Sequence, residues 1–161
     1  MLHLIPPPLH RALLRLAHAA RKAIWRVRRP RVAGCRVLAL DGQGRVLLIR
    51  HSYGSRTWMP PGGGIHAGRE DAVEAARREL LEETGCVIDA PRQVVAVTQD
   101  LHGASNRIHV VVGRTGSVPR ADMREIVAAR FFALDALPPD MARGLVEDLR
   151  GWIAAYHSSE N

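Results

Sequence analysis

The sequence predicts an α/β fold with a mixed β-sheet, because strand-like segments surround one central helix and a second helix closes the chain. Apolar runs at 34–40 and 45–51 flank a Gly/Asp-rich turn at 41–44, which indicates a β-hairpin. Further runs at 93–99, 107–114 and 129–134 also have the character of strands. The length of 161 residues suits one domain with a single core and one appendage.

Two segments carry helix signals within this pattern. The first runs from Glu70 to about Thr84, with Gly85 where a helix C-cap is expected. The second covers 138–157, where Pro139 and Asp140 are residue types that favour a helix start. The segment before the first helix, 52–64, is rich in glycine and proline and is predicted to be a loop.

The basic charge is concentrated at the N-terminus. The formal net charge is +7, yet residues 1–40 hold nine of the 23 Lys and Arg and none of the 16 Asp and Glu. Between arginines, residues 8–29 place apolar side chains at three- and four-residue intervals, which is typical of a basic amphipathic helix. We therefore expect a helical extension at 1–31 and a separate domain at 32–161.

The role of this extension stays open at the level of sequence. A basic amphipathic helix can pack on its own domain or at the interface of a homodimer, lie on an anionic membrane, or contact RNA. No apolar run reaches the roughly 20 residues of a membrane span, and no secretory signal is evident. Cys35 and Cys86 do not make a disulfide framework, so we expect reduced cysteines and a cytoplasmic location.

Three glutamates share one face of the central helix. At 100° per residue, Glu79, Glu82 and Glu83 fall within an arc of roughly 100°, and no Lys or Arg follows four residues later to pair with them. Mg²⁺ prefers oxygen ligands and is typically held by a few carboxylates together with substrate phosphate. The glycines at 62–64 let the backbone approach such an ion closely. The sequence therefore predicts phosphoryl chemistry at a metal.

The spacing of these residues resembles the signature of the Nudix hydrolases, G-x5-E-x7-R-E-U-x-E-E-x-G-U, in which U is a bulky apolar residue. The match begins at Gly64 and departs only at its last position, where Cys86 replaces Ile, Leu or Val. The flanking segments WMPPGGG and ARFFALDALP also resemble those of the family, so the resemblance covers roughly residues 34–140. It implies a Nudix-type α/β/α sandwich.

One irregularity distinguishes the glycine loop from the usual family pattern. Arg69 stands between Gly68 and Glu70, so the loop is one residue longer than G-G-G-x-x-x-G-E. This leaves open whether the carbonyl of Gly63 or that of Gly64 faces the metal.

The resemblance implies hydrolysis of a nucleoside diphosphate linked to another moiety, through attack of water on phosphorus, with Mg²⁺ as cofactor and Mn²⁺ as a substitute. The implied substrate is a nucleotide-type small molecule. Two alternatives compete with this hypothesis. One is a non-catalytic Nudix module that binds nucleotides. The other is a membrane- or nucleic-acid-associated protein led by the N-terminal helix.

The resemblance also implies roles for single residues. The expected metal ligands are Gly64, Glu79, Glu82 and Glu83, and one of the glutamates could double as the base. Glu70 is expected to orient the helix or the ligands from outside the metal site, with direct ligation as the alternative. Arg78 is expected to hold a carboxylate in orientation rather than to touch the substrate. Glu125 precedes the aromatic strand, where the general base of this family often lies; an ordinary loop carboxylate is the alternative.

Four residues near the glycine loop are candidates for substrate binding, because an arginine can clamp a phosphate and an aromatic ring can stack on a base. For the tryptophan, packing in the core is an equally good interpretation. The candidates are Arg50, His51, Arg56 and Trp58.

Overall fold

The computed structural model describes residues 31–101, 104–123 and 125–159, together with residues 12, 13, 16, 17 and 20. Five strands form one sheet in the order β3-β4-β1-β2-β5. β1 and β4 run parallel, whereas β1–β2, β2–β5 and β3–β4 are antiparallel, which confirms the predicted mixed sheet. The strands are β1 (Arg31–Leu40), β2 (Val46–His51), β3 (Asp89–Leu101), β4 (Ala104–Arg114) and β5 (Ile126–Phe132).

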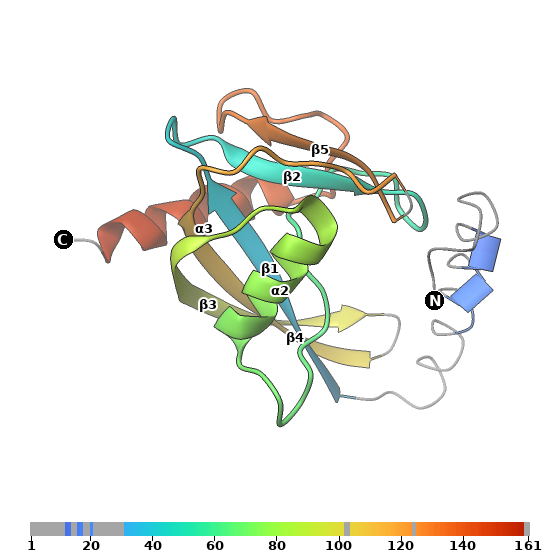
Figure 1. Cartoon of the computed structure of the whole chain (residues 1–161). Coiled ribbons are helices and arrows are strands. Elements are labelled where there is room, and N and C mark those ends of the chain that lie inside the picture. The colour runs from blue at the N-terminus through green and yellow to red at the C-terminus, as the bar shows by residue number, and fades with distance from the viewer. Residues whose placement is uncertain are drawn as a thin grey trace.

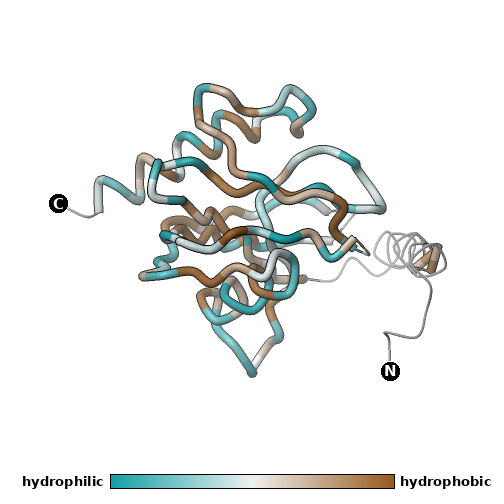
Figure 2. The backbone as a smooth tube through the Cα atoms, turned by 45° about the horizontal axis from the view of Figure 1, so that its top comes forward, coloured by the Kyte–Doolittle hydropathy of each residue, from teal (hydrophilic) through white to brown (hydrophobic). Residues whose placement is uncertain are grey.

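Two helices cover opposite faces of this sheet (Figure 1), α2 (Ala72–Thr84) and α3 (Leu145–Ser158). The alternation of side chains along β1 explains how one sheet serves both. Val37 and Ala39 belong to the buried cluster beneath α2, whereas Leu38 and Leu40 belong to the cluster beneath α3. The apolar colouring of the central strands in Figure 2 reflects these two interior layers. The result is an α/β/α sandwich.

The extension predicted at 8–29 lies largely outside the described residues, and the boundary between 1–31 and 32–161 stays a prediction. In the part of the chain that the structure describes, no helix is long and apolar enough to cross a membrane.

β1 and β2 do form the predicted antiparallel connection, but they separate directly after it. Their register contains a single pair, Leu40 with Val46, next to the turn. Farther from the turn, the glycine-rich segment runs between the two strands. Met59 exchanges backbone hydrogen bonds with Ile49 of β2, and the segment also accepts hydrogen bonds from β1. The simple hairpin expected from the sequence is therefore a split pair of strands with a loop inserted between them.

Backbone hydrogen bonds to β1 fix the position of the glycines along that strand. The carbonyl of Pro61 accepts from the amide of Val37 over 2.8 Å, and the carbonyl of Gly63 accepts from the amide of Cys35 over 2.9 Å. Since unpaired backbone groups are costly to bury, these bonds hold the loop in one register. This register places the glycines beside α2.

The boundaries of both helices differ from the sequence-based expectation. α2 begins at Ala72 rather than Glu70, because Asp71 is its N-cap and forms a capping box with Glu74. Gly85 adopts φ 69° at the C-cap, as predicted.

α3 begins at Leu145, well after Pro139. The amide of Trp58 donates to the carbonyl of Asp140, and Trp58 also forms a β-bridge with Met141. The predicted first turn of this helix is therefore used to pair with the inserted loop.

Candidate active site

The three glutamates of α2 differ strongly in their surroundings. The side chain of Glu83 is 9% exposed, that of Glu79 is 15% exposed and that of Glu82 is 60% exposed. Glu83 accepts a hydrogen bond from the amide of Gly62, and Nε2 of His51 lies 3.9 Å from its other oxygen. Along this helix face, the carboxyl group of Glu83 is buried, whereas that of Glu82 is exposed to solvent.

Burial raises the pKa of Glu83 to about 8, although the hydrogen bond from Gly62 acts in the opposite direction. The negative charges of Glu79, Glu125 and Asp122 raise this pKa further. Burial likewise raises the pKa of Glu79, and Arg78 lowers it again in part. The site thus gathers more negative charge than its protein partners neutralise.

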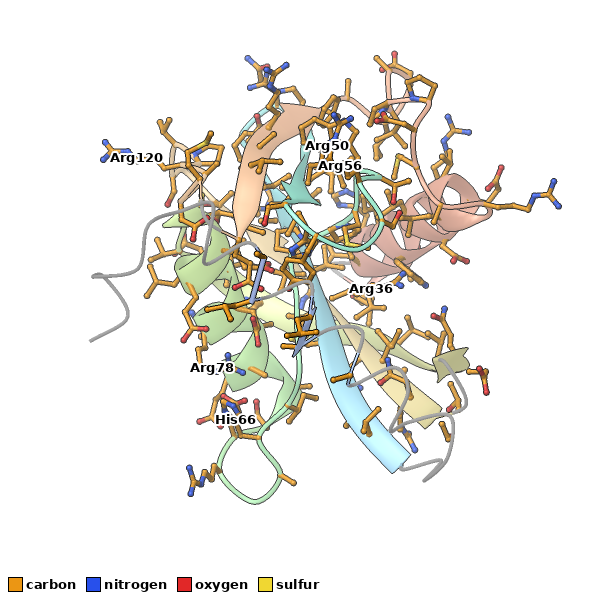
Figure 3. The ribbon with its side chains drawn as sticks, turned by 90° about the vertical axis from the view of Figure 1, so that its right-hand side faces the viewer. Arg36, Arg50, Arg56, His66, Arg78 and Arg120 are labelled. Carbon is orange, nitrogen blue, oxygen red and sulfur yellow. The ribbon has the colours of Figure 1, made fainter. Side chains whose placement is uncertain are left out.

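Arg78 is the hub of the hydrogen bonds on this helix (Figure 3). Its guanidinium donates to both oxygens of Glu70, to Glu79 over 2.7 Å and to Glu82 over 3.2 Å. A further bond reaches the carbonyl of Gly64 over 2.9 Å. No basic residue follows these glutamates in the sequence, and their basic partner is Arg78, which precedes them.

Glu70 owes its position to the same guanidinium. It accepts from Nε and Nη2 of Arg78 and from the amide of His66. The hydrogen bonds from Arg78 and His66 lower the pKa of Glu70 to about 2. Glu70 therefore stays ionised and anchors Arg78 from outside the helix.

A cavity of about 70 Å³ opens in front of the glutamate helix. Its lining residues are Glu79, Glu82, Glu83, Asp122, Glu125 and Ile126. The structure thus brings Glu125 to the three glutamates of α2 from a distant loop. Asp122 is a neighbour that the sequence reasoning missed. Its carboxylate accepts from the amides of Glu125 and Ile126, and only its position just before Glu125 could have suggested it.

The end of β2 connects the buried glutamate of α2 with the loop. Tyr53 donates a hydrogen bond from its hydroxyl to Glu125, and the amide of Ser52 donates to the carbonyl of Glu125. The rings of His51 and Tyr53 are 5.3 Å apart, and His51 in turn lies beside Glu83. Among the predicted substrate-binding residues, His51 is therefore adjacent to the carboxylates.

The glycine loop closes the site at the level of the backbone. A Cβ atom at Gly63 would overlap the carboxylate of Glu79, so only glycine permits this approach. The carbonyl of Gly63 points to β1 and accepts from Cys35, whereas the carbonyl of Gly64 accepts from Arg78. Of the two carbonyls considered in the sequence, Gly64 is on the side of the glutamate helix.

The remaining substrate candidates lie apart from the carboxylates. Trp58 is buried in the cluster beneath α3, where its ring meets the edge of Phe132. Arg50 lies 4.8 Å over the same ring and forms an ion pair with Asp140. These contacts favour a packing role for Trp58. Arg56 is exposed in the loop between them.

The donor set fits a hard cation. Carboxylate oxygens line the small cavity, and two of the carboxyl groups have raised pKa values because burial and mutual repulsion disfavour their charged forms. Among the described residues, no three His, Cys, Asp or Glu side chains already converge as a metal site. Arg78 instead holds Glu79 and Glu82, so an ion would have to compete with this arginine for them.

The α/β/α sandwich with a glycine loop inserted beside a glutamate helix defines a domain of the Nudix type. A model of the NUDIX domain matches residues 29–156. The chain belongs to the Nudix hydrolase family.

Individual relatives agree with this assignment. An RNA pyrophosphohydrolase of Sodalis glossinidius is 34% identical over 131 residues, which span 77% of this chain and 67% of that protein. Other RNA pyrophosphohydrolases match over segments that span between 27% and 39% of their own lengths. An oxidized purine nucleoside triphosphate hydrolase of Danio rerio is 29% identical over 98 residues, which span 59% of this chain and 62% of that protein.

Among solved structures, the MutT NUDIX hydrolase from Burkholderia pseudomallei superposes with a TM-score of 0.65 at 25% identity. This alignment covers 74% of the present chain and 95% of that chain.

Proposed function

We propose that this protein hydrolyses a phosphoanhydride bond in a nucleoside diphosphate linked to another moiety, with Mg²⁺ as cofactor and Mn²⁺ as a substitute. The observation that carries the proposal is the acidic cavity in which Glu79, Glu82, Glu83 and Glu125 meet beside a bare glycine backbone. Such an arrangement suits a cation and a phosphate group bound together.

Glu79, Glu82 and Glu83 would hold the ion, together with the carbonyl of Gly64. When bound, the ion supplies positive charge that offsets the charge of the phosphates and makes a water molecule more acidic. Arg78 orients Glu79 and Glu82 through its hydrogen bonds, and Glu70 anchors Arg78. Groups that orient metal ligands in this way typically contribute about 10- to 100-fold to affinity or activity.

Glu125 is the proposed general base. It lines the same cavity as the metal-binding glutamates, and Tyr53 and Ser52 fix its side chain and backbone. A carboxylate in this position can take the proton of the attacking water as the oxygen approaches phosphorus. Its partners in the segment just after β2 therefore set the direction from which the water is activated.

The relatives support two substrate classes. The similarity to RNA pyrophosphohydrolases supports the polyphosphorylated 5′ end of RNA, and the basic residues of the N-terminal segment would suit such a polyanion. The similarity to the Danio rerio protein supports a free purine nucleoside triphosphate as the second candidate. Both place a nucleoside next to a phosphoanhydride bond.

The decisive experiment is a panel of nucleotides and a 5′-triphosphorylated RNA oligonucleotide, assayed for released phosphate and pyrophosphate with and without Mg²⁺. We expect turnover that needs the ion and that is lost in Glu83→Gln. Tight nucleotide binding without turnover of any member would instead support the non-catalytic module.

The N-terminal extension is proposed to serve localisation, homodimer formation or RNA contact rather than catalysis. The deletion of residues 1–30 stops just before β1, which begins at Arg31. The truncated protein should then hydrolyse small nucleotides at nearly the rate of the full chain. Loss of the folded domain on truncation would show that the extension belongs to the core. Vesicle binding and RNA binding by the two proteins distinguish its other roles.

A further inference from the structure

A second and larger cavity, of about 800 Å³, lies on the other side of the glycine loop. β1 forms its floor, the loop from Met59 to Ala67 forms one wall, and the neighbouring ends of β3 and β4 form another. Gly62 and Gly63 line this cavity, yet Gly62 also binds Glu83 and Gly63 packs against Glu79. The backbone of these two glycines therefore lies between the two cavities.

Within the described part of the chain, one charged side chain lines this mainly apolar cavity. Arg36 lies on the same face of β1 as Leu38 and Leu40, which face α3, and is half-buried. Figure 3 shows it beside β1 on the α3 side, across the strand from Arg78. The guanidinium is thus partly removed from water.

Arg36 has no hydrogen bond or ion pair with the residues that the structure describes, and Asp148 of α3 influences it only from beyond ion-pair distance. Burial lowers the pKa of Arg36, which reflects the loss of water around its charge. A desolvated guanidinium with five donors calls for a ligand that carries acceptors.

Two amide side chains line the same cavity. Asn106 of β4 pairs with Val32 of β1, and Gln99 of β3 pairs with Asn106, so the two amides are direct neighbours across the strands. Arginine and side-chain amides are the groups that most often recognise the edges of purines. Apolar contacts from Ile108 and Met59 suit the flat faces of a base.

We propose that this cavity holds the base of the substrate and that Arg36 selects a 6-oxopurine, such as guanine or hypoxanthine, by donating to O6 and N7. This inference rests on the proposed function, since it assigns the nucleoside end of the substrate to one side of the glycine loop and the phosphates to the other. Adenine presents an amino group where a 6-oxopurine presents O6. Arg36 would then lose one hydrogen-bond acceptor, and its N–H donors would lie opposite the N–H donors of that amino group.

The test compares kcat/KM for GTP, ITP and ATP in the wild type, in Arg36→Met and in Arg130→Met. Arg130 is an exposed arginine of β5, outside both cavities, and controls for loss of one positive charge. We expect the wild type and Arg130→Met to prefer GTP and ITP over ATP by about 10-fold or more. In Arg36→Met the preference should fall towards unity, mainly through a lower rate with GTP and ITP.

Two results would overturn the inference. The wild type could turn over the three nucleotides equally, or Arg36→Met could lower all three rates by one factor, which would indicate contact with phosphate or a structural role.

Binding of the methylene-bridged analogues of GTP and ATP gives a second measurement that needs no hydrolysis. It separates the base site from the proposed activity. If neither GTP nor ATP is hydrolysed, but Arg36→Met removes a binding preference for the guanosine analogue, the proposed activity fails and the base site stands. Equal binding of the two analogues by the wild type refutes the base site.

Discussion

The amide of Gly62 donates a hydrogen bond to Oε2 of Glu83 over 2.9 Å, although the two residues are 21 positions apart. The inserted loop that carries Gly62 is itself paired with β1 and β2. The buried carboxyl group is therefore positioned by the backbone of the sheet, and the accuracy of the site depends on residues that have no functional side chain.

Replacement of Gly63 by alanine tests this dependence. The new Cβ would overlap the carboxylate of Glu79, which must rotate away. A displacement of about 1 Å in a catalytic group can cost on the order of 100-fold in rate, so we expect kcat to fall by about that factor. Gly42→Ala is the matched control, because the space around Gly42 is open. Full activity in Gly63→Ala would contradict the expectation that catalysis needs the carboxylate of Glu79 in this position.

The buried carboxyl group of Glu83 makes stability depend on pH in the metal-free protein. Its pKa in the folded state, about 8, lies above its ordinary value of 4.5. Its contribution to stability is therefore fully present below pH 4.5 and is lost as the pH rises through 8. We expect the melting temperature in EDTA to fall between pH 5 and 8. The corresponding loss in the free energy of unfolding is on the order of a few kcal/mol.

Glu83→Gln is the control for this pH dependence, since glutamine carries no titrating proton. Its melting temperature should be flatter over the same range. Addition of Mg²⁺ to the wild type at pH 7 should stabilise the protein and release a proton, which calorimetry in two buffers of different ionisation enthalpy can count. Metal binding without proton release would contradict the protonated state of Glu83.

Local sequence was enough to predict α2 and its acidic face. The apolar side of that helix, its three glutamates and the C-cap at Gly85 all depend on residues within a few positions of one another. The N-cap is equally local, since Asp71 and Glu74 have the spacing of a capping box, and the predicted start at Glu70 is two residues too early.

The parts that escaped prediction are long-range. Nothing near the turn at 41–44 indicates that β1 and β2 separate after one residue pair, because the cause is a loop that enters later in the chain. The start of α3 was misplaced for the same reason, since Asp140 pairs with Trp58. Likewise the partnership of Tyr53 with Glu125 spans 72 positions, and no periodicity encodes it.

Arg78→Lys tests whether the guanidinium hub matters beyond its charge. Lysine keeps the positive charge but cannot donate to Glu70, Glu79 and Glu82 together from one planar fork. We expect the apparent affinity for Mg²⁺ or the value of kcat to fall by about 10- to 100-fold. Within the described residues, the neighbouring Arg77 donates a hydrogen bond to the carbonyl of Ile88 and to no glutamate, so Arg77→Lys is the control. Equal effects of the two changes would count against the hub.

Tyr53→Phe tests the support of the proposed base. Removal of the hydroxyl deletes the hydrogen bond to Glu125 but keeps the ring beside His51. If Glu125 accepts the proton of the attacking water, a loosely held carboxylate should lower kcat by about 10-fold while KM changes little, since general-base catalysis itself contributes roughly 100- to 10,000-fold. The effect should disappear in the background of Glu125→Gln, because the two changes then act on the same step.

Ser55→Ala, an exposed change in the same loop, controls for general loosening of that loop. Additive losses in the double variant would place Tyr53 in another role, and the base would have to be sought among the glutamates of α2.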